Sequence, residues 1–133
     1  MLINQISVFL ENKPGKLSEF VNLLADNKID LEALSIAETQ DYGIARIIVD
    51  KPEELKALLS EKSWPCTSTP VLAANVPDEP GSLTKILTVL AEGNISIEYS
   101  YAFFSRNSGP CVVLRVEDNE TVQKMLQNAG IQC

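Results

Sequence analysis

Apolar and polar residues follow two different periods along the chain, and the same succession of periods occurs twice. Residues 6–10 and 72–76 alternate apolar with polar positions, as does a strand that has one face on a core. Each stretch is followed by apolar residues at i, i+3, i+4 and i+7, which is the period of a helix packed on one side. These positions are Leu17, Phe20, Val21 and Leu24 in the first copy, and Leu83, Ile86, Leu87 and Leu90 in the second. The pattern predicts a strand followed by a helix in each copy.

The later elements repeat as well. Strands rich in β-branched or aromatic residues are predicted near 30–39, 44–50, 96–105 and 111–117. A turn at 41–43 separates the two strands of the first copy. Second helices are predicted to begin at Pro52 and Asn119, with acidic residues in the first turn, where the helix dipole favours them. Each copy is therefore predicted to be βαββα, closed by another strand.

The two copies align when the sequence is shifted by 66 residues, and by 67 after one extra residue near 106–108. The identical pairs are Pro14/Pro80, Gly15/Gly81, Leu17/Leu83, Leu24/Leu90, Ala25/Ala91, Ile29/Ile95 and Glu32/Glu98. This predicts an α+β chain of two ferredoxin-like βαββαβ repeats side by side, with antiparallel sheets that carry helices on one face. The expected domains are residues 1–69 and 70–133.

The junction between the repeats has no flexible linker. Residues 64–70 run directly into the apolar stretch 71–76, so the closing strand of the first repeat is expected to continue into the first strand of the second. At the other end, the second repeat stops at Gly130-Ile-Gln-Cys133, where its closing strand should begin. That strand is predicted to be short, or to be supplied by another chain.

Charge and composition exclude several classes of function. The 133 residues carry 11 Lys and Arg against 18 Asp and Glu, a net charge of −7, and no histidine. The negative charge opposes binding to nucleic acid and to anionic membranes. Without histidine the chain lacks the usual neutral-pH general base and the commonest transition-metal ligand. We expect no catalytic residues, no metal site and no cofactor.

The sequence also predicts a cytoplasmic location. It has no secretory signal pattern, and no stretch approaches the roughly 20 apolar residues that span a bilayer. Cys66, Cys111 and Cys133 are odd in number and include no Cys-x-x-Cys pair, which suits reduced thiols that serve as small packing residues.

Two turns and the segments after them carry a resemblance to a known family. The first is Glu11-Asn-Lys-Pro-Gly15-Lys-Leu with the helix end Leu24-Ala-Asp-Asn-Lys-Ile-Asp-Leu31, and the second is Asp78-Glu-Pro-Gly81-Ser-Leu with Leu90-Ala-Glu-Gly-Asn-Ile-Ser-Ile97. Nearly the whole chain resembles ACT domains, the small-molecule sensing modules of amino-acid metabolism. It is similar in particular to small stand-alone bacterial proteins made of two ACT domains.

The resemblance implies regulation by ligand binding rather than catalysis. In ACT proteins a free amino acid commonly sits where two domains meet, held by the turn after the first strand and by the start of the second strand. Asn12 matches a ligand-contacting Asn of the serine-sensing members, whereas Asp30 and Ser96 stand at a position where the family usually has Asn. Asp78 replaces the Asn in the second repeat, so the two turns need not be equivalent.

The residues themselves point to the same turns. Gly15 and Gly81 allow a ligand to approach the backbone, and each following helix presents unpaired N–H groups to a carboxylate. Asn12 and Lys13 suit a carboxylate, whereas Asp78 and Glu79 suit an ammonium group. The candidate ligand-binding residues are Asn12, Lys13, Pro14, Gly15, Leu17, Asp30, Asp78, Pro80, Gly81, Ser82 and Ser96. The alternative is that each Pro-Gly merely turns the chain and starts a helix.

The aromatic strand near Glu98-Tyr-Ser-Tyr-Ala-Phe103 suggests an interface. By register, Ser100 and Ala102 should face the helices, while Tyr99, Tyr101 and Phe103 lie on the opposite face of the sheet. Together with Phe9 they are predicted to form an apolar interface covered by an identical chain, giving a homodimer. The reversed register, with the aromatic residues in the core, is the alternative.

Rival functions of ferredoxin-like folds lack their chemistry here. A phosphatase would need an Arg in the first loop, a metal chaperone would need paired Cys there, and an RNA-binding sheet would need positive charge. The sequence therefore predicts a non-enzymatic regulatory module that binds a small amino acid or related metabolite between ACT domains and passes its occupancy to a protein partner in trans. The alternative function is a ligand-free protein-interaction or structural module of the same fold.

Overall fold

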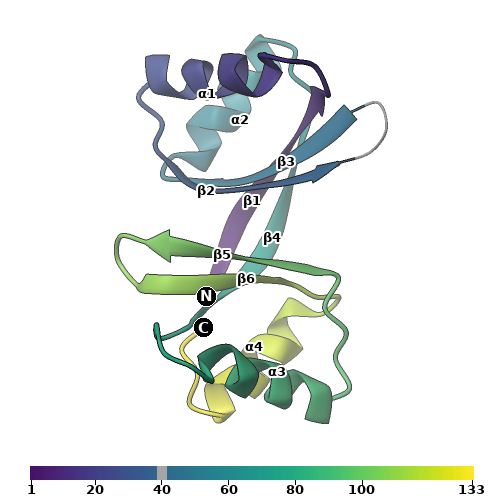
Figure 1. Cartoon of the computed structure of the whole chain (residues 1–133), viewed down its shortest axis with the longest axis vertical. Helices are drawn as coiled ribbons and strands as arrows, with labels where there is room; N and C mark the ends of the chain where they lie inside the picture. The colour runs from purple at the N-terminus through teal and green to yellow at the C-terminus, as the bar shows by residue number, and fades with distance from the viewer. Residues whose placement is uncertain (39–41) are drawn as a thin grey trace. The chain divides into compact units, whose positions relative to one another are not determined.

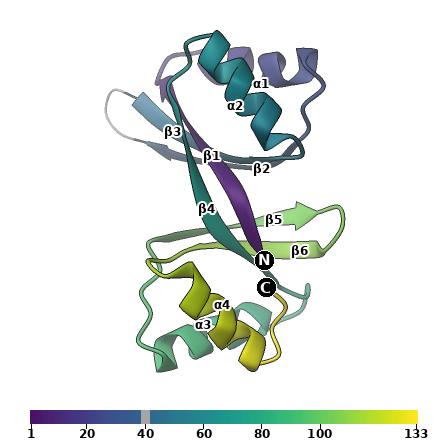
Figure 2. The ribbon, with the colours of Figure 1, turned by 180° about the vertical axis from the view of Figure 1, so that it is seen from behind.

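The computed structural model describes residues 1–38 and 42–133, and of residues 38 and 42 only the backbone. The described chain forms two compact units (Figures 1 and 2). The N-terminal unit is Asn4–Thr69, and the C-terminal unit is Met1–Ile3 together with Pro70–Cys133. The first three residues of the chain thus belong to the unit built mainly from the second repeat.

The N-terminal unit contains three antiparallel strands in the order β2-β3-β1, with two helices on one face (Figure 1). In chain order its elements are β1 (Leu2–Glu11), α1 (Lys16–Asp26), β2 (Leu31–Glu38), β3 (Tyr42–Val49) and α2 (Pro52–Glu61). Alternate strand residues such as Ile6, Val8 and Ile47 are completely buried with Phe20 and Leu24 of α1. Burial of these side chains under the helices holds the unit together, at about 1.5–3 kcal/mol for each large apolar side chain.

The C-terminal unit repeats this arrangement, with strands in the order β4-β6-β5. Its elements are β4 (Cys66–Asn75), α3 (Ser82–Glu92), β5 (Tyr99–Ser105), β6 (Gly109–Arg115) and α4 (Asn119–Asn128). Leu72 and Leu114 of the sheet are buried with Ile86 and Leu90 of α3 and Leu126 of α4. Figure 2 shows α3 and α4 on the same face of this sheet.

The predicted α+β fold with two βαββα repeats is confirmed, with some shifted boundaries. The strand predicted over 96–105 begins only at Tyr99, because residues 94–98 form a connection in which Asn94 has a φ of 57°. The predicted turn at 41–43 includes residue 41, which lies outside the described residues. The single strand β4 continues through the junction between the repeats, as its uninterrupted sequence predicts.

The closing position of each sheet is filled from the chain itself. In the N-terminal unit the Phe9 N–H donates to the Pro65 carbonyl over 3.1 Å. In the C-terminal unit the Ala73 N–H donates to the Met1 carbonyl over 2.8 Å, and the Asn75 N–H donates to the Gln132 carbonyl over 2.9 Å. The outer edge of β4 is therefore paired with both ends of the chain, which lie close together in Figures 1 and 2.

The described helices are ten or eleven residues long, and none of them has the length and apolar character that a bilayer span needs. The three cysteines are free thiols. Burial raises the pKa of the Cys111 and Cys133 thiols, which keeps both protonated and unreactive at neutral pH.

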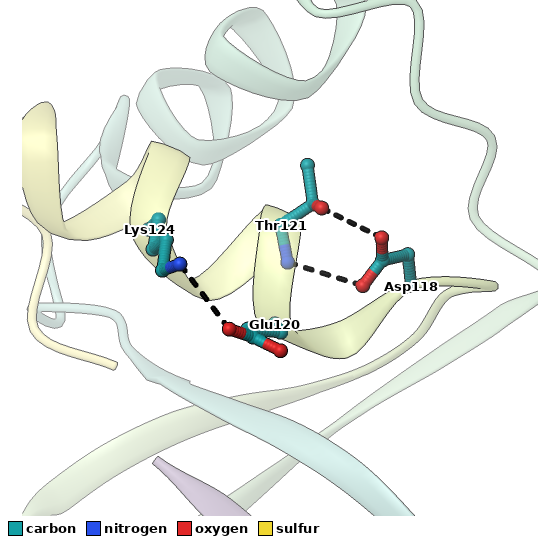
Figure 3. Close-up of polar contacts among 4 residues, drawn as sticks. All are labelled: Asp118, Glu120, Thr121 and Lys124. Atoms are coloured by element: carbon teal, nitrogen blue, oxygen red, sulfur yellow. Dashed lines mark hydrogen bonds and ion pairs between the residues drawn. The ribbon is translucent and has the colours of Figure 1, made fainter.

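Helix α4 begins with a side-chain cap. Figure 3 shows Asp118 accepting hydrogen bonds from the Thr121 N–H, at 3.2 Å, and from the Thr121 hydroxyl, at 2.6 Å. Lys124 binds Glu120 over 3.2 Å one turn further on. The hydrogen bonds from Thr121 lower the pKa of the Asp118 carboxyl, since they favour its charged form.

Removal of Met1–Ile3 should weaken the C-terminal unit. The truncation loses the Ala73 N–H bond to Met1 and the 3.3 Å bond from the Met1 amino group to the Ala73 carbonyl, together worth about 1–3 kcal/mol. Hydrogen exchange measured by mass spectrometry should show faster exchange of the Ala73 amide. The Phe9 amide, bonded to Pro65 in the other unit, is the internal control and should remain protected. Equal exchange at Ala73 in both chains would contradict the assigned pairing.

Capping by Asp118 should give the chain an acid-dependent stability. Because the folded-state pKa lies below the ordinary value of 3.8, the stabilisation is complete above that value and is lost as the pH falls through the folded pKa. The Asp118→Asn variant keeps a cap that does not titrate. Urea midpoints of wild type should therefore fall relative to those of the variant below pH 3.8. Asp26→Asn, at an exposed carboxylate without a cap bond, should not reproduce this difference.

Candidate functional site

Two glycine turns connect the first strand of each repeat to its first helix. We call residues 11–15 the α1 elbow and residues 77–81 the α3 elbow. Gly15 and Gly81 precede the helices with φ angles of 87° and 91°, a left-handed conformation that side chains other than glycine adopt at a cost. Apart from the glycine and its two chain neighbours, no residue has an atom within 4 Å of the place where a Cβ would stand at either glycine. The backbone of both elbows is therefore open to a ligand.

The hydrogen bonds of the elbows leave some helix donors free. The Glu79 N–H donates to the Pro77 carbonyl over 2.8 Å, and the Lys85 N–H donates to the Gly81 carbonyl over 3.1 Å. The Leu83 and Thr84 N–H groups lie between these bonds, in the first turn of α3, and have no acceptor in the described structure. Such donors at a helix start attract a carboxylate or another anion.

A cavity of about 460 Å³ opens beside the α3 elbow, and we call it the α3 cavity. Its volume lies in the range of small-molecule sites, roughly 300–1,000 Å³. It is bounded by the elbow, the first turn of α3 and facing parts of β5 and β6. The lining residues are Val76, Pro77, Asp78, Glu79, Gly81, Leu83, Thr84, Ala102, Phe103, Pro110, Cys111 and Val112. All of them belong to the C-terminal unit.

The α3 cavity is lined by both polar and apolar residues. The Asp78 and Glu79 carboxylates are exposed and take part in no ion pair or hydrogen bond within the described structure. The free N–H groups of Leu83 and Thr84 are nearby on the same elbow and helix start. The cavity thus offers groups for an ammonium and for a carboxylate next to an apolar surface.

The N-terminal unit differs at the position that forms this wall. Ala102 pairs with Val112, and at the equivalent place in the first repeat Ile36 pairs with Ala45. Ile36 is branched and longer than Ala102, and its Cγ2 lies 3.6 Å from the site of a Cβ on Gly43. The larger side chain occupies the place that Ala102 leaves open. The groove of about 590 Å³ near Gly15 runs along α1 instead, toward Lys62 and Trp64.

The α1 elbow also has different electrostatics. The Lys13 ammonium donates to the Glu11 carboxylate over 2.8 Å, both side chains being exposed. This hydrogen bond lowers the pKa of Glu11 and raises the pKa of Lys13. Because Lys13 is already paired within the elbow, it is less available to a ligand carboxylate than its sequence position indicates.

The structure brings together only some of the predicted ligand-binding residues. Asp78 and Gly81 line the α3 cavity, whereas Pro80 and Ser82 line a second cavity of about 470 Å³ on the other side of the same elbow. Asn12, Lys13, Pro14 and Gly15 are exposed in the α1 elbow, and Leu17 packs half-buried against the N-terminal core.

Asp30 and Ser96 lie far from the elbow of their own unit. Glu11, at the elbow, is paired with Tyr42, whereas β2 starts opposite Val49 at the other end of β3. Seven residues of strand separate the two ends by roughly 20 Å. The Asp30 N–H donates to the Asp50 carboxylate over 2.9 Å, and Ser96 lies in the connection before β5. Within each unit, a ligand at the elbow does not reach these residues.

The aromatic residues of β5 lie on the face that the register predicts. Ser100 and Ala102 are paired with Leu114 and Val112 of the core, so Tyr99, Tyr101 and Phe103 point to the opposite face. All three are half-buried in the single chain, and Phe103 also contributes to the α3 cavity. Phe9 is 37% exposed. The homodimer through these residues stays a prediction.

Sequence reasoning missed most of the apolar wall of the α3 cavity, including Ala102, Pro110 and Val112. These residues come from strands far along the chain from the elbow, so no local motif identifies them. The repeat itself carried the signal, because the alignment places a small Ala102 where the first repeat has Ile36. Among the described residues no cluster of three or more Cys, Asp or Glu is arranged to hold a metal ion.

Comparison with known proteins gives consistent results. A family model described as an ACT domain pair matches residues 1–132. The crystal structure of protein BT0572 from Bacteroides thetaiotaomicron is 36% identical, with a TM-score of 0.90 over 99% of this chain and 91% of that one. The ligand-free regulatory subunit of aspartate kinase from Thermus thermophilus shares the fold at 16% identity, with a TM-score of 0.61 over 95% of this chain and 91% of that one. A search of curated proteins gave no match.

Substitution of Gly81 should destabilise the chain through its backbone alone. Because a Cβ at Gly81 meets no atom within 4 Å, Gly81→Ala should cost only the left-handed conformation, about 1–2 kcal/mol, and Gly81→Asn should cost less. Urea unfolding provides the measurement. Gly43→Ala is the matched control, since a Cβ there makes ordinary contacts at 3.6 and 3.7 Å and the φ is not positive. An equal loss in both Ala variants would contradict the assigned role of Gly81.

Proposed function

The chain belongs to the ACT domain pair family, and from this premise we propose that it is a non-enzymatic regulatory module which binds a small amino acid or a related zwitterion in the α3 cavity. The observation that carries the proposal is the combination of unpaired carboxylates, free helix N–H groups and an apolar wall around one cavity. Each of these features matches one part of an amino acid.

The binding mode follows from charge. The ammonium group of the ligand lies against Asp78 and Glu79, whose carboxylates have no competing partner in the described structure. The ligand carboxylate accepts hydrogen bonds from the Leu83 and Thr84 N–H groups, where the helix dipole of α3 adds a favourable field. The ligand side chain then contacts the wall formed by Ala102 and Val112.

The comparison of the two repeats supports one site of this kind per chain. Ile36 takes the place of Ala102 in the N-terminal unit, and Lys13 is paired with Glu11 there, so the α1 elbow has neither the same space nor the same free charges. The volume of the α3 cavity, about 460 Å³, is sufficient for a single amino acid.

The output of binding acts through a separate protein. A ligand shifts a protein between two arrangements only by its difference in affinity for them, and the described residues include no group of three or more Cys, Asp or Glu that could hold a metal ion. We therefore expect a protein partner in trans to distinguish the occupied from the empty α3 elbow.

Substitution of Ala102 by isoleucine, the residue at the equivalent position of the first repeat, should weaken ligand binding. A thermal-shift screen of the wild-type chain against the twenty amino acids should give at least one stabilising ligand, confirmed by calorimetry, with about 2.7 kcal/mol of stabilisation at a concentration one hundred times Kd. Ala102→Ile should weaken this response, because the larger side chain takes space at the wall of the cavity, where Ile36 stands in the other unit. Ile36→Ala is the matched control and should bind normally.

Two outcomes would count against the proposal. Retained binding in Ala102→Ile, with binding lost in Ile36→Ala, would move the site away from the α3 cavity. The absence of any ligand among the amino acids would favour a ligand-free protein-interaction module of the same fold.

A further inference from the structure

A groove along helix α1 contains the only tryptophan of the chain, and we call it the Trp64 groove. Its volume, about 590 Å³, is in the range of small-molecule sites. One wall belongs to α1 and the other to the segment after α2. All of its residues belong to the N-terminal unit, so the groove is separate from the α3 cavity. The side chains that matter for the argument are Ser18, Glu19, Asn22, Asp26, Lys62 and Trp64.

Trp64 is held in position but is not fully covered. Its ring packs against Phe20 of the core, with the ring centroids 5.6 Å apart and the planes tilted by 53°. Its backbone N–H donates to the Leu59 carbonyl over 2.9 Å. The side chain is half-buried, and its indole N–H has no acceptor among the described residues. A ring that is already fixed loses little conformational entropy when a ligand stacks on it.

The fold does not need a tryptophan at this position. The repeat alignment places Ile131 at the position of Trp64, and Ala129 at the position of Lys62. Ile131 is buried in the core of the C-terminal unit, and its N–H makes the backbone hydrogen bond equivalent to that of Trp64. Trp64 and Lys62 therefore add an aromatic surface and a cation that the shared fold does not require.

The α1 wall of the groove carries polar side chains along one line of the helix. Ser18, Asn22 and Asp26 follow each other at intervals of four, so they share a helix face. All three are exposed, and none of them has a hydrogen bond or an ion pair through its side chain in the described structure. Glu19, in contrast, is paired with Lys16 over 3.6 Å. The line thus offers a hydroxyl, an amide and a carboxylate to the edge of a ligand.

A planar nitrogen heterocycle has the two kinds of surface that this groove matches. Its flat face stacks on an aromatic side chain, and its edge carries N–H donors and nitrogen acceptors. The amide of an Asn side chain can form a pair of hydrogen bonds with the edge of adenine. A sugar would leave several of its hydroxyls without partners against the indole ring, and a plain benzene ring would leave the polar line of α1 unused.

We propose that the Trp64 groove binds a purine, as the free base or as a nucleoside. The purine ring stacks on Trp64, its edge exchanges two hydrogen bonds with the Asn22 amide, and Asp26 accepts a hydrogen bond from a further N–H or hydroxyl of the ligand. A nucleoside carries no phosphate, so the net charge of −7 that opposes nucleic acid does not oppose it. This site does not depend on amino-acid binding in the α3 cavity, and it gives the chain a second small-molecule input.

The fluorescence of Trp64 tests the proposal, because the full-length chain has no other tryptophan. Titration with adenosine, under selective excitation of tryptophan, should give saturable quenching, whereas glucose and phenol should give none. Asn22→Ala should raise the Kd for adenosine at least about fivefold, since the pair of hydrogen bonds is lost. Asn22 is exposed, so this variant keeps the fold. Trp64→Ile, which copies the second repeat, should abolish the heat of adenosine binding in calorimetry.

The matched control is Thr88→Ala, at the exposed position of α3 that is equivalent to Asn22. This variant should bind adenosine as the wild type does, and so should Ala102→Ile, because the α3 cavity is a different site. The absence of saturable quenching by adenosine and by guanosine at millimolar concentration would overturn the proposal. So would an unchanged Kd in Asn22→Ala, or glucose or phenol binding as tightly as adenosine.

Discussion

The structure depends on backbone hydrogen bonds at the outer edges of two long strands, β1 and β4. A buried strand cannot leave a row of N–H and C=O groups unpaired, so each three-stranded sheet needs a further segment. In the N-terminal unit this segment begins at Pro65, and in the C-terminal unit it is Met1–Ile3 with the last residues of the chain. Neither repeat completes its sheet with its own βαββα residues. The α1 elbow follows β1 and the α3 elbow follows β4, so the hydrogen bonds at the outer edges of these strands also position the elbows.

The two repeats share one backbone fold but differ in many of their side chains. Phe20 and Ile86 fill the same core position, and the backbone hydrogen bonds of one elbow are repeated in the other. Among the many differences, two lie on the edge strand of each unit, where Ala102 and Phe104 stand in place of Ile36 and Glu38. The fold needs none of these substitutions, since each repeat tolerates its own version.

Much of the fold was predictable because periodicity reports local structure. The alternation around Ile6 and Leu72 and the helical spacing from Leu17 and Leu83 identify the elements and the faces they bury. The closing segment was not predictable in the same way. Met1 pairs with Ala73, 72 residues away, and no local pattern marks a strand of three residues as part of the distant repeat.

The candidate site was predictable in part, for a similar reason. The glycine elbows are local motifs, and Gly15 and Gly81 do adopt the left-handed conformation that the motif requires. The wall of the α3 cavity depends on which residues of β5 and β6 lie beside the elbow, which only the strand register decides. Asp30 and Ser96 follow the helices in sequence but stand at the far end of the sheet from the elbow of their own unit, so their part in a ligand site stays a prediction.

The pairing of Met1 with Ala73 has a consequence for biosynthesis. The ribosome delivers residues 4–69 as one continuous stretch, so the N-terminal unit has all of its residues before the second repeat is made. The C-terminal unit, in contrast, needs residues 1–3 and residues 70–133 together. Contacts between such distant segments slow folding, since the intervening loop must close first. Residues 1–3 are thus made before residues 4–69 but reach their native partner only after residue 73 has been made.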